Sequence, residues 1–203
     1  MAERNRPPKI YYKPVIRAPV EKHSDDETYS VKRELWQEAV SWAKTIVITM
    51  MFAFVITNFI IMNAWVPSAS MEDTIRTNDR LIAFRLSYLF REPERYDIVV
   101  FRGERINYVK RIIGLPGEEL VIRNGHVYIN GSDVPQRYDF VKGSLSGNHG
   151  PFVIPEGYFF VLGDWRDNSE DSRRWEQPFI SRGRLQGRAI FRFFPGFANL
   201  TNR

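Results

Sequence analysis

The sequence predicts a mainly β protein, in which one N-terminal transmembrane helix precedes a mostly antiparallel β domain with little helix. Two observations carry this prediction. Residues 45–66 form an uncharged apolar run, and the chain beyond residue 80 consists of short segments rich in β-branched and aromatic residues. Gly, Pro and Asn separate these segments, which is typical of strands joined by turns. A length of 203 residues suits one domain with extensions.

The N-terminal part, residues 1–44, is expected to be a tail that ends in a short helix. Residues 1–30 are rich in proline and charge and have neither a helical nor a strand period, which favours a mobile tail. Residues 31–44 have the apolar spacing of a short amphipathic helix. Its apolar positions are Leu35, Ala39, Val40, Trp42 and Ala43.

The uncharged run, residues 45–66, is long enough to be a membrane anchor, because roughly 20 apolar residues in a helix cross a bilayer. A buried helix of a soluble protein is the alternative interpretation. A cleaved signal peptide fits less well, since the run begins too deep in the chain and is too long for a signal core. The sequence therefore predicts an uncleaved anchor.

The charges that flank the anchor predict its orientation. Lys32, Arg33 and Lys44 precede the run, whereas Glu72 and Asp73 follow it. Lysine and arginine are retained on the cytoplasmic side of membrane proteins. The segment before the anchor is therefore expected in the cytoplasm, and residues 67–203 are expected to be exported.

The exported part contains six segments with strand character and one strong turn signal. Asn124-Gly125 lies inside one of these segments, between EELVIR and HVYI, which is typical of a tight β-hairpin. Residues 136–155 are expected to form a long loop or a small flap. The expected strand segments are RLIAFRL (80–86), YDIVVFR (96–102), INYVKRIIG (106–114), EELVIRNGHVYING (118–131), YFFVLGD (158–164) and GRAIFRFF (187–194).

Composition narrows the functional classes. The absence of cysteine excludes disulfides, cysteine nucleophiles and thiolate metal sites. A net charge of +5 fits an anionic membrane surface, and no block of Lys and Arg with interleaved aromatic residues indicates nucleic-acid binding. We therefore expect a membrane lipid partner and no nucleic-acid partner.

The three histidines, His23, His126 and His149, are poor candidates for catalysis. His23 lies in the tail, and the other two lie beside or within glycine-containing turns, so neither a Ser-His-Asp triad nor a histidine metal site is well supported. A serine can instead use a lysine as its base if burial lowers the lysine pKa from about 10.4 towards neutrality.

Three segments supply such a serine and lysine, and together they resemble the type I signal peptidases. The segments are VPSASMEDTI (66–75), YVKRIIGLPGE (108–118) and GDWRDNSEDSR (163–173), and the resemblance covers residues 44–198. Each segment alone is a weak signal, but all three in this order behind one anchor are a strong signal. The resemblance implies a bacterial cell membrane enzyme that is anchored by one helix and has its catalytic domain on the outer side.

The resemblance also implies a role for six residues. Ser70 is the nucleophile and Lys110 the general base, Ser68 helps to form the oxyanion hole, and Ser169 orients the lysine. Asp171 and Arg173 form a supporting salt bridge. The residues themselves agree, because Ser70 follows the membrane exit and Lys110 lies on an expected strand whose apolar neighbours can exclude water.

The family further implies a fold, a substrate and a reaction. The fold is one of coiled antiparallel sheets, with a smaller β region inserted within residues 118–160. The substrate is the signal peptide of an exported preprotein, which is cut after small residues in an Ala-X-Ala pattern. The resemblance implies neither a metal nor an organic cofactor. The sequence departs from the family pattern at Asp73, Trp165 and Glu176, which are usually Pro, Asn and Gly. These departures concern loop geometry and substrate preference.

Two alternatives remain open on the sequence. One is another Ser-Lys hydrolase on a related fold, such as a self-cleaving repressor, although such proteins lack the 45–66 anchor. The other is a non-catalytic, membrane-tethered β module that binds export partners. Cleavage of a preprotein, with a serine-to-alanine control, separates these possibilities.

Overall fold

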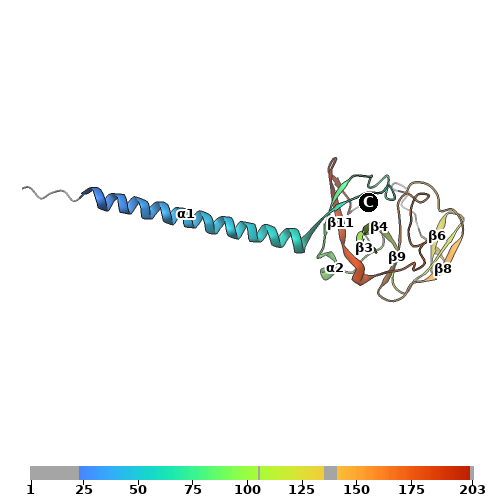
Figure 1. The fold of residues 1–203 in the computed structure, drawn as a ribbon. Helices are drawn as coiled ribbons and strands as arrows, with labels where there is room; N and C mark the ends of the chain where they lie inside the picture. The colour runs from blue at the N-terminus through green and yellow to red at the C-terminus, as the bar shows by residue number, and fades with distance from the viewer. Residues whose placement is uncertain (1–22, 105, 135–140, 202–203) are drawn as a thin grey trace, which may run out of the picture. The chain divides into compact units, whose positions relative to one another are not determined.

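The computed structural model describes residues 23–104, 106–134 and 141–201 (Figure 1). Contacts divide the chain into two units, of which the first ends at Met50 and the second begins at Met51. The described part of the first unit, residues 23–50, is helical. The second unit contains all of the strands in the described residues, so the prediction of a mainly β protein behind an N-terminal helix is confirmed.

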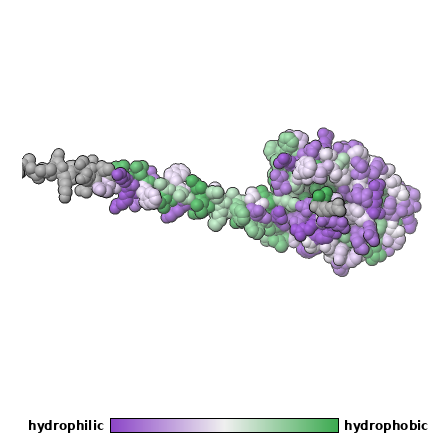
Figure 2. Space-filling view, in the orientation of Figure 1, coloured by the Kyte–Doolittle hydropathy of each residue, from purple (hydrophilic) through white to green (hydrophobic). Residues whose placement is uncertain are grey.

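Helix α1, His23–Val55, continues as a π-helical turn, Ile56–Ile60. One helix in the described residues, Tyr29–Ile60, is long and apolar enough to cross a membrane, with a mean hydropathy of 1.9. Figure 2 shows that the second half of α1 is mostly hydrophobic, and its large apolar side chains from Ile46 to Phe59 are exposed. These exposed side chains are those that lipid would cover.

The structure corrects the predicted start of this helix. Residues 23–30, expected in a mobile tail, are already helical, and the amphipathic segment 31–44 continues without a break into the apolar run. Residues 1–22 lie outside the described part. The tail interpretation extended too far because helix continuity along the following apolar segment outweighs the weak local preference of a polar sequence.

The structure also corrects the predicted end of the anchor. Strand β1, Ile61–Trp65, occupies the last part of the 45–66 run and pairs antiparallel with strand β2, Arg80–Phe84. Ile61 is already extended, and Ala64 is buried in the core of the second unit. Apolar, β-branched residues suit a strand as well as a helix, so the uncharged run alone contained no sign of this boundary.

The larger sheet carries the site described below. Its strands lie in the order β1-β2-β11-β3-β4-β9-β10, and β12 pairs with β11. All of the pairs are antiparallel, as predicted. The remaining strands are β3 (Ile98–Arg102), β4 (Asn107–Gly114), β9 (Tyr158–Leu162), β10 (Ile180–Ser181), β11 (Leu185–Phe194) and β12 (Ala198–Asn199).

A second sheet has the order β7-β6-β5-β8. It consists of β5 (Glu119–Arg123), β6 (His126–Ile129), β7 (Ser132–Asp133) and β8 (His149–Val153). The predicted hairpin at Asn124-Gly125 joins β5 to β6, and both turn residues have positive φ, 50° and 84°. Asparagine and glycine tolerate this left-handed conformation, which the two-residue turn requires.

The second sheet also corrects the loop predicted at residues 136–155. Strand β8 occupies part of that range and pairs with β5, while residues 135–140 lie outside the described part. Two short helices, α2 (Ser87–Phe90) and the 3-10 turn Arg182–Arg184, complete the described elements. Short strands such as β8 have too few residues to establish a period of two in the sequence.

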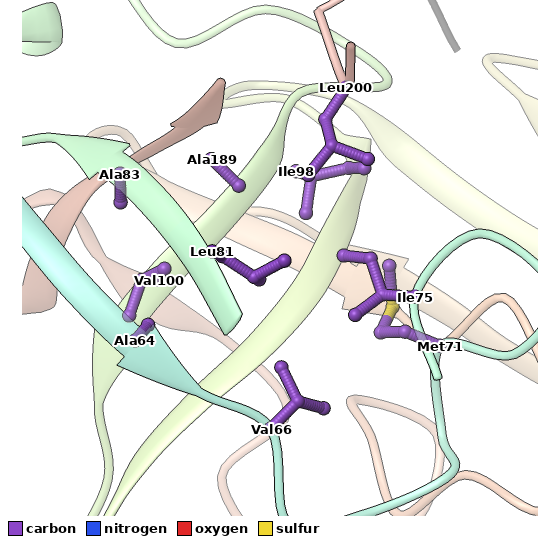
Figure 3. Packing of buried hydrophobic residues seen from close by; sticks show 10 residues of the cluster. All are labelled: Ala64, Val66, Met71, Ile75, Leu81, Ala83, Ile98, Val100, Ala189 and Leu200. Carbon is purple, nitrogen blue, oxygen red and sulfur yellow. The ribbon is translucent and has the colours of Figure 1, made fainter. Parts of the chain in front are cut away.

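Three clusters of buried apolar side chains hold the second unit together. One of them joins β1, β2, β3 and β11 to the segment that follows Ser70. Figure 3 shows two side chains of that segment, Met71 and Ile75, beside those of the strands. Because both side chains are fully buried, the segment that follows Ser70 is anchored in the core.

We predict that β1 belongs to the folded domain and not to the anchor. A chain that begins at residue 61 keeps β1, whereas a chain that begins at residue 67 loses the strand together with the buried Ala64 and Val66. The loss of this burial costs about 2 kcal/mol. The shorter chain should therefore unfold several degrees lower in a thermal melt. Equal midpoints for the two chains would contradict the assignment.

Candidate active site

Ser70 lies in the turn that follows β1. Its side chain is almost fully buried, with 8% of the residue exposed, and its carbonyl oxygen accepts a hydrogen bond of 3.0 Å from the backbone N–H of Trp165. Its neighbour Met71 is fully buried in the core. The hydroxyl of Ser70 is therefore presented by a backbone that is held on both sides.

Lys110 lies in the middle of strand β4 and is only 2% exposed. Its Nζ is 2.6 Å from Ser70 Oγ and 3.2 Å from Ser169 Oγ. Residues from separate parts of the chain therefore meet at one buried amine. Strand pairing with β3 positions the lysine backbone, since Lys110 lies opposite Val99.

Burial lowers the pKa of Lys110 to about 8. Desolvation is the largest cause, because removing water disfavours the charged ammonium. The nearby carboxylates of Asp171 and Asp164 raise this pKa, but by less. At slightly alkaline pH a substantial fraction of the amine is thus neutral and able to accept a proton.

Ser68 lies beside Ser70. Its hydroxyl oxygen is 3.5 Å from Ser70 Oγ, at the limit of a hydrogen bond, and the residue is exposed. The two serine hydroxyls thus border the same small space. A donor in this place can reach an oxygen that develops on a carbonyl attacked by Ser70.

Ser169, Asp171 and Arg173 come from the loop that follows β9. Asp171 is fully buried, and its carboxylate accepts hydrogen bonds from Arg173 Nε at 2.8 Å and from the same guanidinium's Nη2 at 2.9 Å. It also accepts a bond of 3.0 Å from the backbone N–H of Gly163. Asp171 therefore ties both ends of this loop together.

The pKa of Asp171 lies below its usual value. Burial acts to raise the pKa, but the hydrogen bonds and charge of Arg173 outweigh that effect, helped by Gly163 and by a hydrogen bond from Ser169. The carboxylate is therefore ionised at neutral pH. Because the ion pair is buried, breaking it by removal of one partner would leave an uncompensated charge in the interior.

The sequence reasoning missed a second buried ion pair at the site. Arg111 Nε and Nη2 donate to the two carboxylate oxygens of Asp164 at 2.8 and 2.6 Å, and both side chains are buried. Thr74 Oγ1 donates to the same carboxylate at 2.6 Å. This network joins strand β4 to the segment that follows Ser70 and to the loop that follows β9. A charged residue directly after Lys110 in an otherwise apolar strand was the available signal.

Gly163 is a further residue that the sequence reasoning missed. A Cβ atom at this position would lie 2.2 Å from Ser169 Oγ and 2.5 Å from the carbonyl oxygen of Ser70. No side chain can be accommodated without moving one of these groups. Glycine is therefore required by the close approach of the segments that carry Ser70 and Ser169.

A small pocket adjoins Ser70. Its volume is about 90 Å³, and it is lined by Val66, Pro67, Ser68, Ser70 and the chain from Ile106 to Val109. Its mostly apolar lining and its size suit small side chains. In the described part of the chain, the free edge of β4 borders it, because residues 107–110 pair with β3 and with no other strand.

The remaining candidates lie elsewhere. His126 is 3.3 Å from Asp133 on the second sheet and is half exposed, and the ring of His149 contacts the carbonyl of Ser146. Among the described residues, no cluster of three or more His, Cys, Asp or Glu could hold a metal ion. His23 is the first residue of α1.

The fold, the anchor helix and the family relationship define a membrane-anchored serine endopeptidase. The family model described as "Signal peptidase, peptidase S26" matches residues 39–194. The chain therefore belongs to the signal peptidase family, peptidase S26. The resemblance identified from the three segments is confirmed.

Individual relatives agree with this assignment. The chain is 38% identical to signal peptidase I of Leptolyngbya laminosa over 162 residues. This match covers 75% of this chain and 78% of the relative. It is 35% identical to signal peptidase I T of Bacillus subtilis over 185 residues. This match covers 86% of this chain and 94% of the relative. A crystal structure of a signal peptidase I from Enterococcus faecalis is 31% identical, covers 48% of this chain and 97% of its own, and has a TM-score of 0.42.

We predict that Gly163→Ala abolishes most of the activity. The added methyl group must displace Ser169 or the Ser70 carbonyl, and a displacement of about 1 Å at reacting groups lowers rates about 100-fold. The measurement is kcat/KM for a signal-peptide substrate. Gly183→Ala is the matched control, since a Cβ there meets nothing within 4 Å. An active Gly163→Ala enzyme would show that the approach is not required.

Proposed function

We propose that this chain removes signal peptides from exported preproteins, cutting after small residues with Ser70 as the nucleophile and Lys110 as the general base. The observation that carries the proposal is the 2.6 Å separation of Lys110 Nζ and Ser70 Oγ, with both residues buried. A lysine held in this way is the arrangement expected for a base that activates a serine.

The reaction begins with the neutral Lys110 amine. Nζ accepts the proton of the Ser70 hydroxyl while Oγ attacks the carbonyl carbon of the scissile peptide bond. The carbonyl oxygen gains negative charge in the tetrahedral intermediate, where the Ser68 hydroxyl and the Ser70 backbone N–H donate hydrogen bonds to it. Removal of one such donor costs about 3–4 kcal/mol of barrier in serine proteases.

The same lysine completes the reaction. The Lys110 ammonium returns its proton to the leaving amine, so the peptide bond breaks and an ester of Ser70 remains. Lys110, neutral again, then accepts a proton from a water molecule as the water oxygen attacks the ester carbonyl. Collapse of the second intermediate, with protonation of Ser70 Oγ, releases the new carboxyl terminus and restores the site.

Ser169 and the buried ion pair orient the base. Ser169 Oγ lies 3.2 Å from Nζ and also bonds Asp171, so the lysine amine is aimed by a group whose own position is held. Asp171 and Arg173 hold the loop that carries Ser169. These residues position the catalytic groups and do not react themselves.

The pocket and the free edge of β4 support the choice of substrate. An extended peptide can add as a further strand beside residues 107–110, with main-chain hydrogen bonds providing affinity. Alternate side chains of the peptide then face the pocket of about 90 Å³. A pocket of that size favours alanine and other small residues, in accord with an Ala-X-Ala pattern.

The anchor supports a membrane location. Helix α1 would cross a bacterial cell membrane once, with the N-terminal segment in the cytoplasm and the β domain outside. Lys32, Arg33 and Lys44 favour this orientation. Within the β domain, the inserted subregion predicted at residues 118–160 would be built around the second sheet and end before β9, since Tyr158–Leu162 belongs to the larger sheet.

We predict that kcat/KM rises with pH through a pKa of about 8, because only the neutral Lys110 amine accepts the Ser70 proton. Lys110→Arg should be as inactive as Lys110→Ala, since a guanidinium stays protonated at any workable pH. The measurement uses a peptide with an Ala-X-Ala site from pH 6 to 10. Ser70→Ala is the control for the nucleophile and should be inactive throughout. A flat profile, or an active Lys110→Arg enzyme, would contradict the mechanism.

The proposed orientation predicts the outcome of limited proteolysis. Protease added to intact spheroplasts should digest the β domain and leave the segment before the anchor intact. Immunoblotting with a tag at each end distinguishes the two parts. Protection of the β domain until the cells are lysed would overturn the orientation.

A further inference from the structure

Lys142 lies where three segments of the site region meet. Its backbone N–H donates to the carbonyl of Asp164 at 2.9 Å, and its own carbonyl accepts from the N–H of Arg166 at 2.8 Å. These bonds form a single parallel β-bridge with Trp165. The backbone of Lys142 is therefore held against the loop that follows β9.

The side chain of Lys142 continues from this bridge towards the segment that follows the nucleophile. Its Nζ is 3.3 Å from Glu72 Oε2 and 4.1 Å from the centroid of the Trp165 ring. An ammonium over an indole face is attracted by the ring and gains further from a carboxylate on another side. The Lys142 ammonium thus bridges Glu72, in the segment that follows Ser70, and Trp165, in the loop that follows β9.

Trp165 bonds Ser70 itself, and Glu72 bonds the residue that precedes Ser70. Trp165 donates its backbone N–H to the Ser70 carbonyl, and the N–H of Glu72 donates to the carbonyl of Ala69 at 2.9 Å. Lys142 therefore links the two backbone segments that determine where Ser70 Oγ lies relative to Lys110.

We propose that Lys142 is a positioning residue that holds the nucleophile turn against the loop carrying Trp165 and so keeps Ser70 at reaction distance from the base. This inference rests on the proposed Ser70–Lys110 mechanism and extends it to Lys142, which lies outside the three segments that resemble the family. Lys142 touches neither Ser70 nor Lys110 in the contacts of the described residues. Its effect on the reaction is transmitted through Glu72 and Trp165.

The exposure of these side chains separates positioning from general support of the fold. The side chains of Lys142 and Glu72 are 39% and 26% exposed, and neither lies in an apolar core cluster. An isolated ion pair of this exposure contributes little to the stability of a protein. A small displacement of a reacting oxygen nevertheless has a large effect on rate. Removal of the cation should therefore slow the reaction more than it destabilises the fold.

The test compares Lys142→Ala and Lys142→Arg with the wild-type full-length chain in detergent. The substrate is a peptide with an Ala-X-Ala site. We expect Lys142→Ala to lower kcat about tenfold with little change in KM, and Lys142→Arg to restore most of the rate. The melting temperature and the pKa of the pH–rate profile should stay at the wild-type values.

Two further variants complete the design. Arg182→Ala removes a comparably exposed cation, with 44% of its side chain exposed, from an ion pair with Glu92 and should leave kcat unchanged. Glu72→Gln should lower kcat, and Glu72→Gln combined with Lys142→Ala should be no slower than Lys142→Ala alone, since the two act through one contact.

Each other outcome overturns the inference. An unchanged kcat in Lys142→Ala contradicts the positioning role. A loss of rate contradicts it too if the melting temperature falls in proportion, or if Arg182→Ala loses the same rate. A rise in KM alone would make Lys142 a substrate contact, and a shifted pH profile would make it a modulator of Lys110. Failure of the wild-type enzyme to cleave, or cleavage by Ser70→Ala, would instead refute the proposed function.

Discussion

A buried amine within hydrogen-bond distance of a buried hydroxyl is the constraint on which the site depends. Lys110 can serve as a base only when it is neutral, and removal from water favours that form. A surface lysine with the same neighbours would stay charged. The interior position of Lys110 on β4, where the strand pairs with β3, is therefore part of the chemistry and not only of the fold.

Burying one amine requires that the other charges nearby be paired. Asp164 is matched by Arg111, and Asp171 by Arg173, each through two hydrogen bonds. Arg166 lies in the same group, where burial lowers its pKa to about 10 despite the opposing effect of Asp164. Paired carboxylates limit how far the pKa of Lys110 falls, since each of them favours the ammonium. The value of about 8 is the balance between desolvation and these charges.

The segment around Ser70 must be immobile for the short Ser–Lys distance to persist. Buried Met71 and Ile75 anchor it in the apolar core, and the Trp165 N–H holds the Ser70 carbonyl. Gly163 allows the loop after β9 to approach so closely that no Cβ fits. Apolar packing, a backbone hydrogen bond and the lack of a side chain at position 163 thus together determine the position of Ser70.

The sequence by itself determined the class of fold and the family, and it predicted six site residues whose contacts the structure then supplied. The short segments rich in β-branched residues, the Asn124-Gly125 turn and the uncharged run are local patterns. Three short motifs in order were enough to identify the family. Only the tertiary structure decided where the anchor helix ends, because apolar residues 61–65 suit either state until β2 provides a strand partner. It also revealed the Arg111–Asp164 pair, the need for glycine at position 163 and the bridge from Lys142 to Glu72. These features join residues that are far apart in the chain, and long-range contacts leave no period or spacing in a single sequence.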